Sequence, residues 1–163
     1  MGVRNSWLVA IHPLPSAPCP PPPHKVVFFN KVLKKRESGL TYRPFAKDSV
    51  VFATGAGTRV NSLTEARLLD IFTGRLKNWN GIGEKPGRIR VLIREAGDSS
   101  FSIIEQQLPA FSDLVFSPRS KILYHEWEMV DMLKKYRYAI GWVSGSSLLH
   151  TGDAIRPVAI NGI

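Results

Sequence analysis

The sequence predicts a single α/β lobe with a mostly parallel or mixed sheet flanked by helices, and three observations carry this prediction. From residue 48 onward, short β-branched apolar segments alternate with segments whose apolar residues recur at helical spacing. The length of 163 residues and the hydrophobic content of 44% are those of one folded domain with its own core. Apolar runs of about 20 residues, the length of a membrane-spanning helix, do not occur in the sequence.

The first predicted strand and helix lie between residues 49 and 74. Residues 49–54 are an apolar, β-branched run that ends at Gly55. Residues 62–65 have the spacing of a helix-capping box, and Gly74 is a typical C-terminal stop. The apolar residues between them recur at helical intervals: Leu63, Ala66, Leu69 and Phe72.

The remaining elements continue the alternation. Residues 78–83 have turn chemistry with Trp79 as an aromatic anchor. Strands are predicted at 89–93, 138–143 and 155–160, and helices at 101–108 and 126–136, with a short helix opening at 144–147. Pro157 indicates an edge position for the last strand. The helix at 126–136 is expected to turn four side chains inward: Trp127, Met129, Val130 and Leu133.

Residues 1–41 are predicted to be a Pro-rich basic leader, partly disordered, in front of the lobe at 42–163. Eight of the 12 prolines fall in the first 47 residues, and five of them crowd into positions 18–23, where they prevent helix and central strand. Residues 1–24 are accordingly expected to be irregular, with a short element within 26–35. The apolar run at 7–11 is shorter than the core of a signal peptide. A single cysteine, Cys19, excludes an intramolecular disulfide framework.

The net charge of +9 is concentrated in this leader. The first 47 residues hold eight basic residues and one acidic residue, whereas the other 116 hold 14 basic and 12 acidic residues. A lobe so nearly balanced makes nucleic acid an unlikely partner. Any preference of the lobe for anions is therefore expected to rest on one arginine and a helix start, rather than on a basic surface.

That arginine is Arg94, at the carboxyl end of a predicted strand. A helix that begins near Ser99 would point free backbone N–H groups outward, and the hydroxyls of Ser99 and Ser100 would add donors. Together with the planar guanidinium of Arg94, these groups form a candidate oxyanion site. The alternative is that Asp98 and the serines are only helix caps. Asp98 would also repel an anion, unless the anion carries a proton that it donates to the carboxylate.

The sequence contains no pattern for catalysis, for a metal or for a cofactor. The four histidines are scattered, and no serine lies in a G-x-S-x-G context. Gly55 and Gly57 lack the third glycine of a dinucleotide fingerprint. We therefore expect no catalytic residue, no metal ligand and no cofactor.

Residues 60–79, with their IFTG…NW segment, followed by a strand and the turn at 94–100, resemble the phosphate-binding (PstS-like) proteins of bacterial ABC transporters. Residues 139–143 and 155–162 resemble the segments that close and leave the second lobe of that family. The resemblance implies the second lobe alone of a type II periplasmic-binding-protein fold, a periplasmic location and a transporter permease as partner. It also implies that Arg94, Asp98, Ser99 and Ser100 contact inorganic phosphate or a similar oxyanion.

Two departures from the family set further expectations. Asp98 stands where the family has a hydroxyl donor, and Ser99 stands where it has a glycine. Nothing before residue 42 resembles the first lobe, which supplies the other half of the ligand shell. We therefore expect millimolar or weaker phosphate binding by this chain alone, and a homo-oligomer formed through the exposed lobe face. The alternative function is that of a degenerate interaction or scaffold protein, whose basic N-terminal tail binds acidic partners or nucleic acid.

Overall fold

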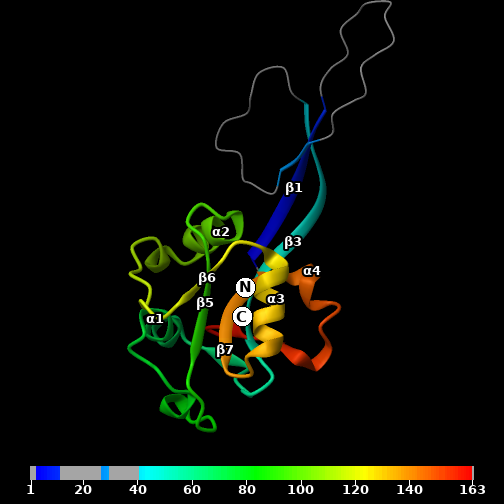
Figure 1. The fold of residues 1–163 in the computed structure, drawn as a ribbon. Helices are drawn as coiled ribbons and strands as arrows, with labels where there is room; N and C mark the ends of the chain where they lie inside the picture. The colour runs from blue at the N-terminus through cyan, green and yellow to red at the C-terminus, as the bar shows by residue number, and fades with distance from the viewer. Residues whose placement is uncertain (1–2, 12–26, 30–40, 163) are drawn as a thin grey trace, which may run out of the picture. The chain divides into compact units, whose positions relative to one another are not determined.

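The computed structural model describes residues 3–11, 27–29 and 41–162, with side chains described from residue 48 onward (Figure 1). The chain divides into two units, one of residues 4–48 and the other of residues 1–3 and 49–163, and each is considered by itself. In the described residues no helix is both long enough and apolar enough to cross a membrane.

The N-terminal unit contains strands where the sequence predicted an irregular arm. β1 (Val3–Ile11) pairs antiparallel with β2 (Val27–Phe29), with Leu8 opposite Phe29, and β1 also neighbours β3 (Thr41–Gly55). The prediction for 1–24 is therefore wrong over β1, because a segment with alternating β-prone residues and no proline of its own is free to pair. β2 lies within the short element expected at 26–35. The prolines at 18–23 lie outside the described residues.

The lobe is built on a mixed sheet, as predicted. The second half of β3 pairs antiparallel with β7 (Ala139–Ser144), from Val50 opposite Ser144 to Thr54 opposite Ile140. β7 is parallel to β5 (Arg90–Arg94), and β5 is parallel to β6 (Lys121–Leu123). β8 (Ile155–Pro157) adds to β3. A separate parallel pair joins β4 (Ser62–Leu63) to β9 (Ala159–Ile160), so the single strand predicted at 155–160 is two strands in different ladders.

Helices cover both faces of this sheet, and the strand residues alternate between two cores. α1 (Glu65–Thr73) and α2 (Ser99–Gln107) pack on one face, and α3 (Glu126–Lys135) packs on the other (Figure 1). Along β5, Val91 and Ile93 belong to the first core and Leu92 to the second. Gly141 lets α3 approach closely, since a Cβ there would lie 2.6 Å from Met129 Sδ. This is a parallel sheet segment buried on both sides.

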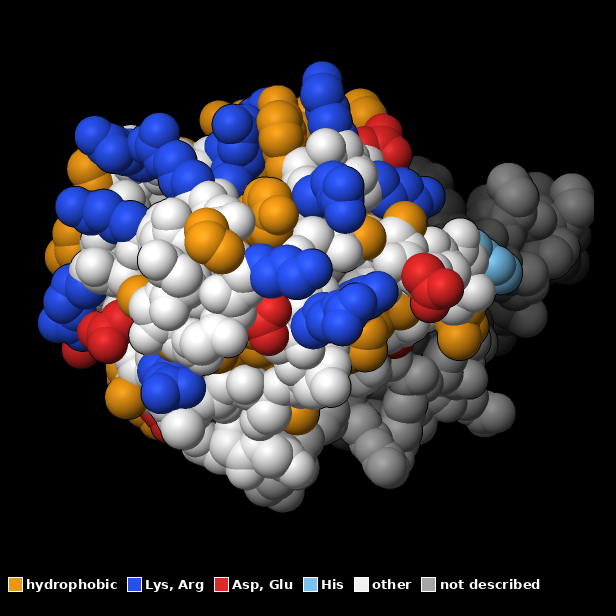
Figure 2. Space-filling model, turned by 90° about the horizontal axis from the view of Figure 1, so that it is seen from below, with side chains coloured by type: hydrophobic (Ala, Val, Ile, Leu, Met, Phe, Trp, Pro, Cys, Tyr) orange, Lys and Arg blue, Asp and Glu red, His pale blue; other side chains and the backbone are white. Residues whose placement is uncertain are grey.

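The parallel pairing gives the sheet two chemically different edges. The carboxyl ends of β5, β6 and β7 lie together and continue into α2, α3 and α4 (Gly145–Leu148), respectively, by way of turns or short connections. The amino ends lie together at the opposite edge. Among the charged side chains on the face seen from that side, lysine and arginine predominate, with hydrophobic side chains and a few acidic ones between them (Figure 2). The predicted oxyanion turn is at the carboxyl edge.

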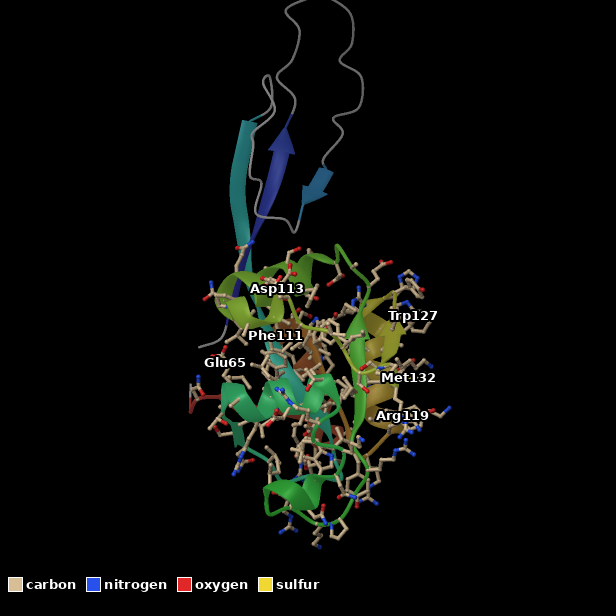
Figure 3. The ribbon with its side chains drawn as sticks, turned by 90° about the vertical axis from the view of Figure 1, so that its left-hand side faces the viewer. Glu65, Phe111, Asp113, Arg119, Trp127 and Met132 are labelled. Atoms are coloured by element: carbon tan, nitrogen blue, oxygen red, sulfur yellow. The ribbon has the colours of Figure 1, made fainter. Side chains whose placement is uncertain are left out.

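Two helix predictions need correction in register. In α3, Met129 and Leu133 are fully buried as expected, but Trp127 is 63% exposed and lies at the outer edge of the lobe (Figure 3). Trp127 stacks on His125 instead of entering the core. α1 begins at Glu65 rather than after Ser62, and its buried residues are Leu68, Ile71 and Phe72. The capping-box spacing at 62–65 misled because Ser62 and Leu63 pair with β9.

The true N-cap of α1 is Thr64, whose Oγ1 accepts a hydrogen bond from Arg67 N at 3.3 Å. We expect Thr64→Ala to lower the free energy of unfolding by about 1 kcal/mol, because an orphan N–H loses its acceptor. Ser62→Ala, two residues away on an exposed position, is the matched control and should change stability by less than about 0.5 kcal/mol. Urea denaturation of both variants measures the change in the free energy of unfolding. A larger effect at Ser62 than at Thr64 would show that Ser62 is the N-cap, as the sequence predicted.

Candidate functional site

The four residues predicted for the oxyanion site lie where β5 passes into α2. Arg94 is the last residue of β5, and Asp98 is the N-cap of α2. Oδ1 of Asp98 accepts hydrogen bonds from the backbone N–H groups of Ser100, at 2.9 Å, and Phe101, at 3.3 Å, and also from the Ser100 hydroxyl. Within the described part of the chain, Ser99 takes no part in these hydrogen bonds. The structure thus brings Arg94, Asp98 and Ser100 together and leaves Ser99 beside them.

Arg94 and Asp98 form an ion pair inside the lobe. Arg94 Nη2 donates to Asp98 Oδ2 at 2.8 Å, and the two side chains are only 8% and 13% exposed. Both carboxylate oxygens of Asp98 are therefore engaged, one by the guanidinium and the other by the N-terminal donors of α2. Asp98 occupies the positive end of the helix as a built-in anion, which is the place where helices of this kind receive a bound oxyanion.

The environment of Asp98 keeps it ionised. Burial raises the pKa of its carboxyl, but the hydrogen bonds from Ser100 and Arg94, the positive charge of Arg94 and the Phe101 N–H together outweigh burial. The net result is a pKa below the usual value for aspartate. At neutral pH the Arg94–Asp98 pair is therefore a neutral unit made of two charges.

The guanidinium of Arg94 is only partly satisfied by this pair. Its Nε and Nη1 atoms are buried and have no hydrogen-bond acceptor in the described structure. An unmet donor in the interior costs about 1–3 kcal/mol, and more when the group is charged. Each of these two nitrogens can therefore donate to an oxygen of an anion that reaches it.

Trp142 supports the site from the core, and sequence reasoning assigned it to packing alone. Its Nε1 donates to Ser100 Oγ at 2.9 Å, and its ring stacks on Phe101 with the ring centres 5.8 Å apart. Phe52 contacts it from β3 and Phe72 contacts it from α1. A buried indole requires an acceptor for its N–H. A tryptophan in a predicted buried strand could therefore have indicated that Trp142 bonds to a polar group nearby.

The second serine-rich turn, at 144–147, is a helix start, as the preferred interpretation of the sequence held. Ser144 caps α4, and its Oγ accepts from Ser147 N at 3.3 Å. Glu126, which the sequence did not single out, accepts from Ser144 N at 2.7 Å and from Ser147 Oγ at 3.0 Å. A carboxylate of the protein itself thus fills this turn too, and the turn offers no second oxyanion site.

Acidic side chains gather around the carboxyl edge of the sheet. Glu128 accepts from the backbone N–H groups of Tyr124, at 2.9 Å, and His125, at 3.0 Å, and these hydrogen bonds lower the pKa of its carboxyl. In the residues that the structure describes, no three His, Cys, Asp or Glu side chains are placed to hold a metal ion. The arrangement can present hydrogen-bond donors to an anion, and the donors with free capacity are the Nε and Nη1 groups of Arg94.

Comparison with known proteins connects this lobe to a family. A family model described as a PBP superfamily domain matches residues 26–155. The Phosphate-binding protein PstS of Borreliella burgdorferi is 28% identical over 87 residues, which are 52% of this chain and 31% of that protein. This chain therefore spans about a third of the length of that curated relative.

Solved structures of similar proteins agree with the observed fold. A putative phosphate ABC transporter substrate-binding protein with bound phosphate from Clostridium perfringens matches with a TM-score of 0.61 and 26% identity, over 71% of this chain and 46% of that one. PstS from Borrelia burgdorferi matches with a TM-score of 0.62 and 18% identity, over 70% of this chain and 47% of that one. The mixed, helix-covered sheet is thus the fold of part of these longer proteins.

Proposed function

Because this chain belongs to the PBP superfamily, we propose that it is a non-catalytic substrate-binding component, or half-component, of an ABC transporter and that its ligand is an oxyanion, phosphate first among them. The observation that carries the proposal is the pair of buried Arg94 nitrogens, Nε and Nη1, that have no acceptor in the described structure. The similar Clostridium perfringens protein, which holds phosphate, supports the choice of ligand.

In this proposal Arg94 binds the anion, and Asp98 limits the affinity of the site for phosphate. A phosphate oxygen accepts from Nε or Nη1 of Arg94, while Nη2 stays bonded to Asp98 at 2.8 Å. The carboxylate cancels the charge of the arginine and repels a dianion, unless a protonated phosphate oxygen donates to it. Binding by this chain alone is therefore proposed to be millimolar or weaker.

The location of the protein and its partner are also proposed, from its similarity to these relatives. The chain would act outside the cytoplasmic membrane, in the periplasm or its equivalent, and would deliver the anion to a transporter permease. Self-association through an exposed face of the lobe remains part of the proposal.

The test is a phosphate titration of the full chain followed by amide NMR. We expect shifts at residues 98–101 with a dissociation constant in the millimolar range, and we expect Arg94→Gln to abolish them because the guanidinium donors are lost. Arg67→Gln, on the exposed face of α1, is the matched control and should bind as the native chain does. Circular dichroism establishes that both variants are folded.

Two results would count against the proposal. Shifts at residues 98–101 that persist unchanged in Arg94→Gln would show that the arginine does not hold the anion. Micromolar affinity in the native chain would show that Asp98 does not weaken the site.

A further inference from the structure

A pocket lies at the opposite edge of the sheet from Arg94. It is a cavity of about 380 Å³ beside α1 and the amino ends of β5 and β6. Five of its lining residues are basic and none is acidic: Lys77, Arg88, Arg90, Arg119 and Lys121. Such a volume is within the range of small-molecule sites, about 300–1,000 Å³.

The fold brings these cations together from three separate segments. β6 pairs parallel with β5, so Arg90 and Lys121, the first residues of the two strands, lie at the same edge. The third segment, around Lys77, lies beside the start of β5. Asn78 forms a β-bridge with Arg88, and Ile89 N donates to Lys77 O at 3.0 Å. Lys77 and Arg119 are 42 positions apart in the sequence, and only tertiary structure places them on one pocket.

The charge of this basic pocket is not compensated. The ion pairs of the described residues join Arg75 to Asp70 and Arg94 to Asp98, and neither includes a basic residue of the pocket. The Arg90 guanidinium instead lies 3.7 Å from the centre of the Tyr136 ring, which fixes its position by a cation–π contact. Lys121 Nζ likewise lies 3.7 Å from Met132 Sδ of α3, so the charged ends of Arg90 and Lys121 turn toward the second core. Lysine and arginine side chains are spread over this face, with hydrophobic side chains and a few acidic ones between them (Figure 2). Lys77, Arg88 and Arg119 are left at the cavity, and three like charges there raise the local potential and attract multivalent anions.

The pocket also has an apolar floor. Four hydrophobic residues line it beneath the basic rim: Ile71, Leu76, Ile89 and Val91. Ile89 and Val91 are at most 9% exposed, and Ile71 is fully buried, so this floor is part of the first core. A cavity with cations at its rim and an apolar base suits an anion with an organic body better than a bare inorganic ion.

We propose that this basic pocket binds a small organic polyphosphate, of the nucleoside di- or triphosphate class. Several phosphoryl groups supply negative charge for the cations left at the cavity, and the guanidinium groups of Arg88 and Arg119 receive phosphoryl oxygens in pairs. The organic part of the ligand lies on the apolar floor. The site is separate from Arg94, because Arg90 and Arg94 stand at the two ends of β5, about 13 Å apart at a rise of about 3.3 Å per residue.

The experiment is calorimetric titration of the full chain with ATP in the presence of EDTA. We expect a dissociation constant in the micromolar range at low ionic strength, weakening as salt screens the charges. The double variant Arg88→Ala/Arg119→Ala should lose affinity at least tenfold. Arg67→Ala/Lys85→Ala removes the same charge from exposed positions outside the pocket and should bind ATP as the native chain does. Arg94→Gln should also bind ATP normally, which separates this site from the proposed phosphate site.

Four results would overturn the proposal. The first is no detectable binding of ATP. The second is an equal loss of affinity in the two double variants, which would indicate a general charge effect. The third is tripolyphosphate binding as tightly as ATP, which would remove the organic body from recognition. The fourth is binding of a DNA oligonucleotide without binding of ATP, which would make this face a nucleic-acid surface.

Discussion

Replacing Asp98 by alanine is expected to lower the free energy of unfolding by about 3–5 kcal/mol, because it leaves the buried charge of Arg94 without its counter-ion. The pair is 8% and 13% exposed, so water cannot replace the lost carboxylate easily. The same change removes the cap from α2, whose Ser100 and Phe101 N–H groups both donate to Asp98. Urea denaturation measures the loss. Asp113→Ala, at an exposed aspartate, is the matched control and should fall within about 0.5 kcal/mol of the native chain.

Phosphate should restore part of this stability. In Asp98→Ala the guanidinium and the start of α2 are free to receive an external oxyanion, which would stabilise the folded state by mass action. We expect phosphate to raise the unfolding midpoint of the variant more than that of the native chain, at ionic strength matched with sodium chloride. Equal effects on both proteins would mean that Asp98 does not occupy the place of an anion.

Acid should erase the difference between the two proteins. Because the pKa of Asp98 is lowered in the folded state, its ionisation stabilises the native chain fully above the unfolded-state pKa, about 3.9 for aspartate. That contribution declines as the pH falls below this value and through the lower folded-state pKa. The native chain should therefore lose more stability than Asp98→Ala between pH 5 and the acid limit, at about the scale of the pair itself. A gap that stays constant with pH would exclude ionised Asp98 as the stabilising partner.

Trp142→Ala should also destabilise the lobe by about 3–5 kcal/mol, the usual result of emptying a large aromatic site in a core. Trp142 is fully buried, contacts the rings of Phe52, Phe72 and Phe101, and donates to Ser100 Oγ at 2.9 Å. Trp127→Ala is the matched control, since that ring is 63% exposed, and should change stability by less than about 0.5 kcal/mol. Similar losses in the two variants would contradict the placement of both rings.

A third variant separates packing from hydrogen bonding at Trp142. Trp142→Phe keeps most of the ring but removes the N–H that reaches Ser100, so we expect a smaller loss than in Trp142→Ala. The missing hydrogen bond is worth about 0.5–1.5 kcal/mol, in addition to the space that the smaller ring leaves. The amide signals of residues 99–101 should shift in this variant, because the start of α2 loses its support from the core.

Local pattern was enough for much of the fold. The strands around Val51, Leu92 and Ile140 were predictable because short, mainly apolar runs bounded by polar and turn residues are characteristic of buried strands. β6 was missed because three residues that begin with an exposed lysine carry no periodic signal. The division of 155–160 into two strands was missed because Ser62 and Ala53, which pair with the two parts, lie about 100 positions away. Strand partners at that distance leave no mark on local periodicity.

The residues of the candidate oxyanion site could be predicted from the sequence, but their hydrogen-bond partners could not. Arg94, Asp98 and Ser100 lie within seven positions, and the sequence there indicates both the end of a strand and the start of a helix. That Asp98 turns one oxygen to the arginine and the other to the helix depends on side-chain geometry. Trp142 and Glu126 reach these turns from other parts of the chain, so spacing along the sequence did not reveal them.

The distribution of charge shows most clearly what the sequence determines and what it leaves to the fold. Counting residues established that the lobe is nearly neutral, with 14 basic and 12 acidic groups after residue 47, and so predicted that any anion preference would rest on one arginine and a helix start. The tertiary structure adds where the charges lie. Parallel pairing of β5 with β6 and β7 sends the amino ends, with Arg88, Arg90 and Lys121, to one edge of the sheet. The carboxyl ends lead to Asp98 and Glu126 at the other. A sum of charges is the same for every arrangement, and only long-range strand pairing decides which charges become neighbours.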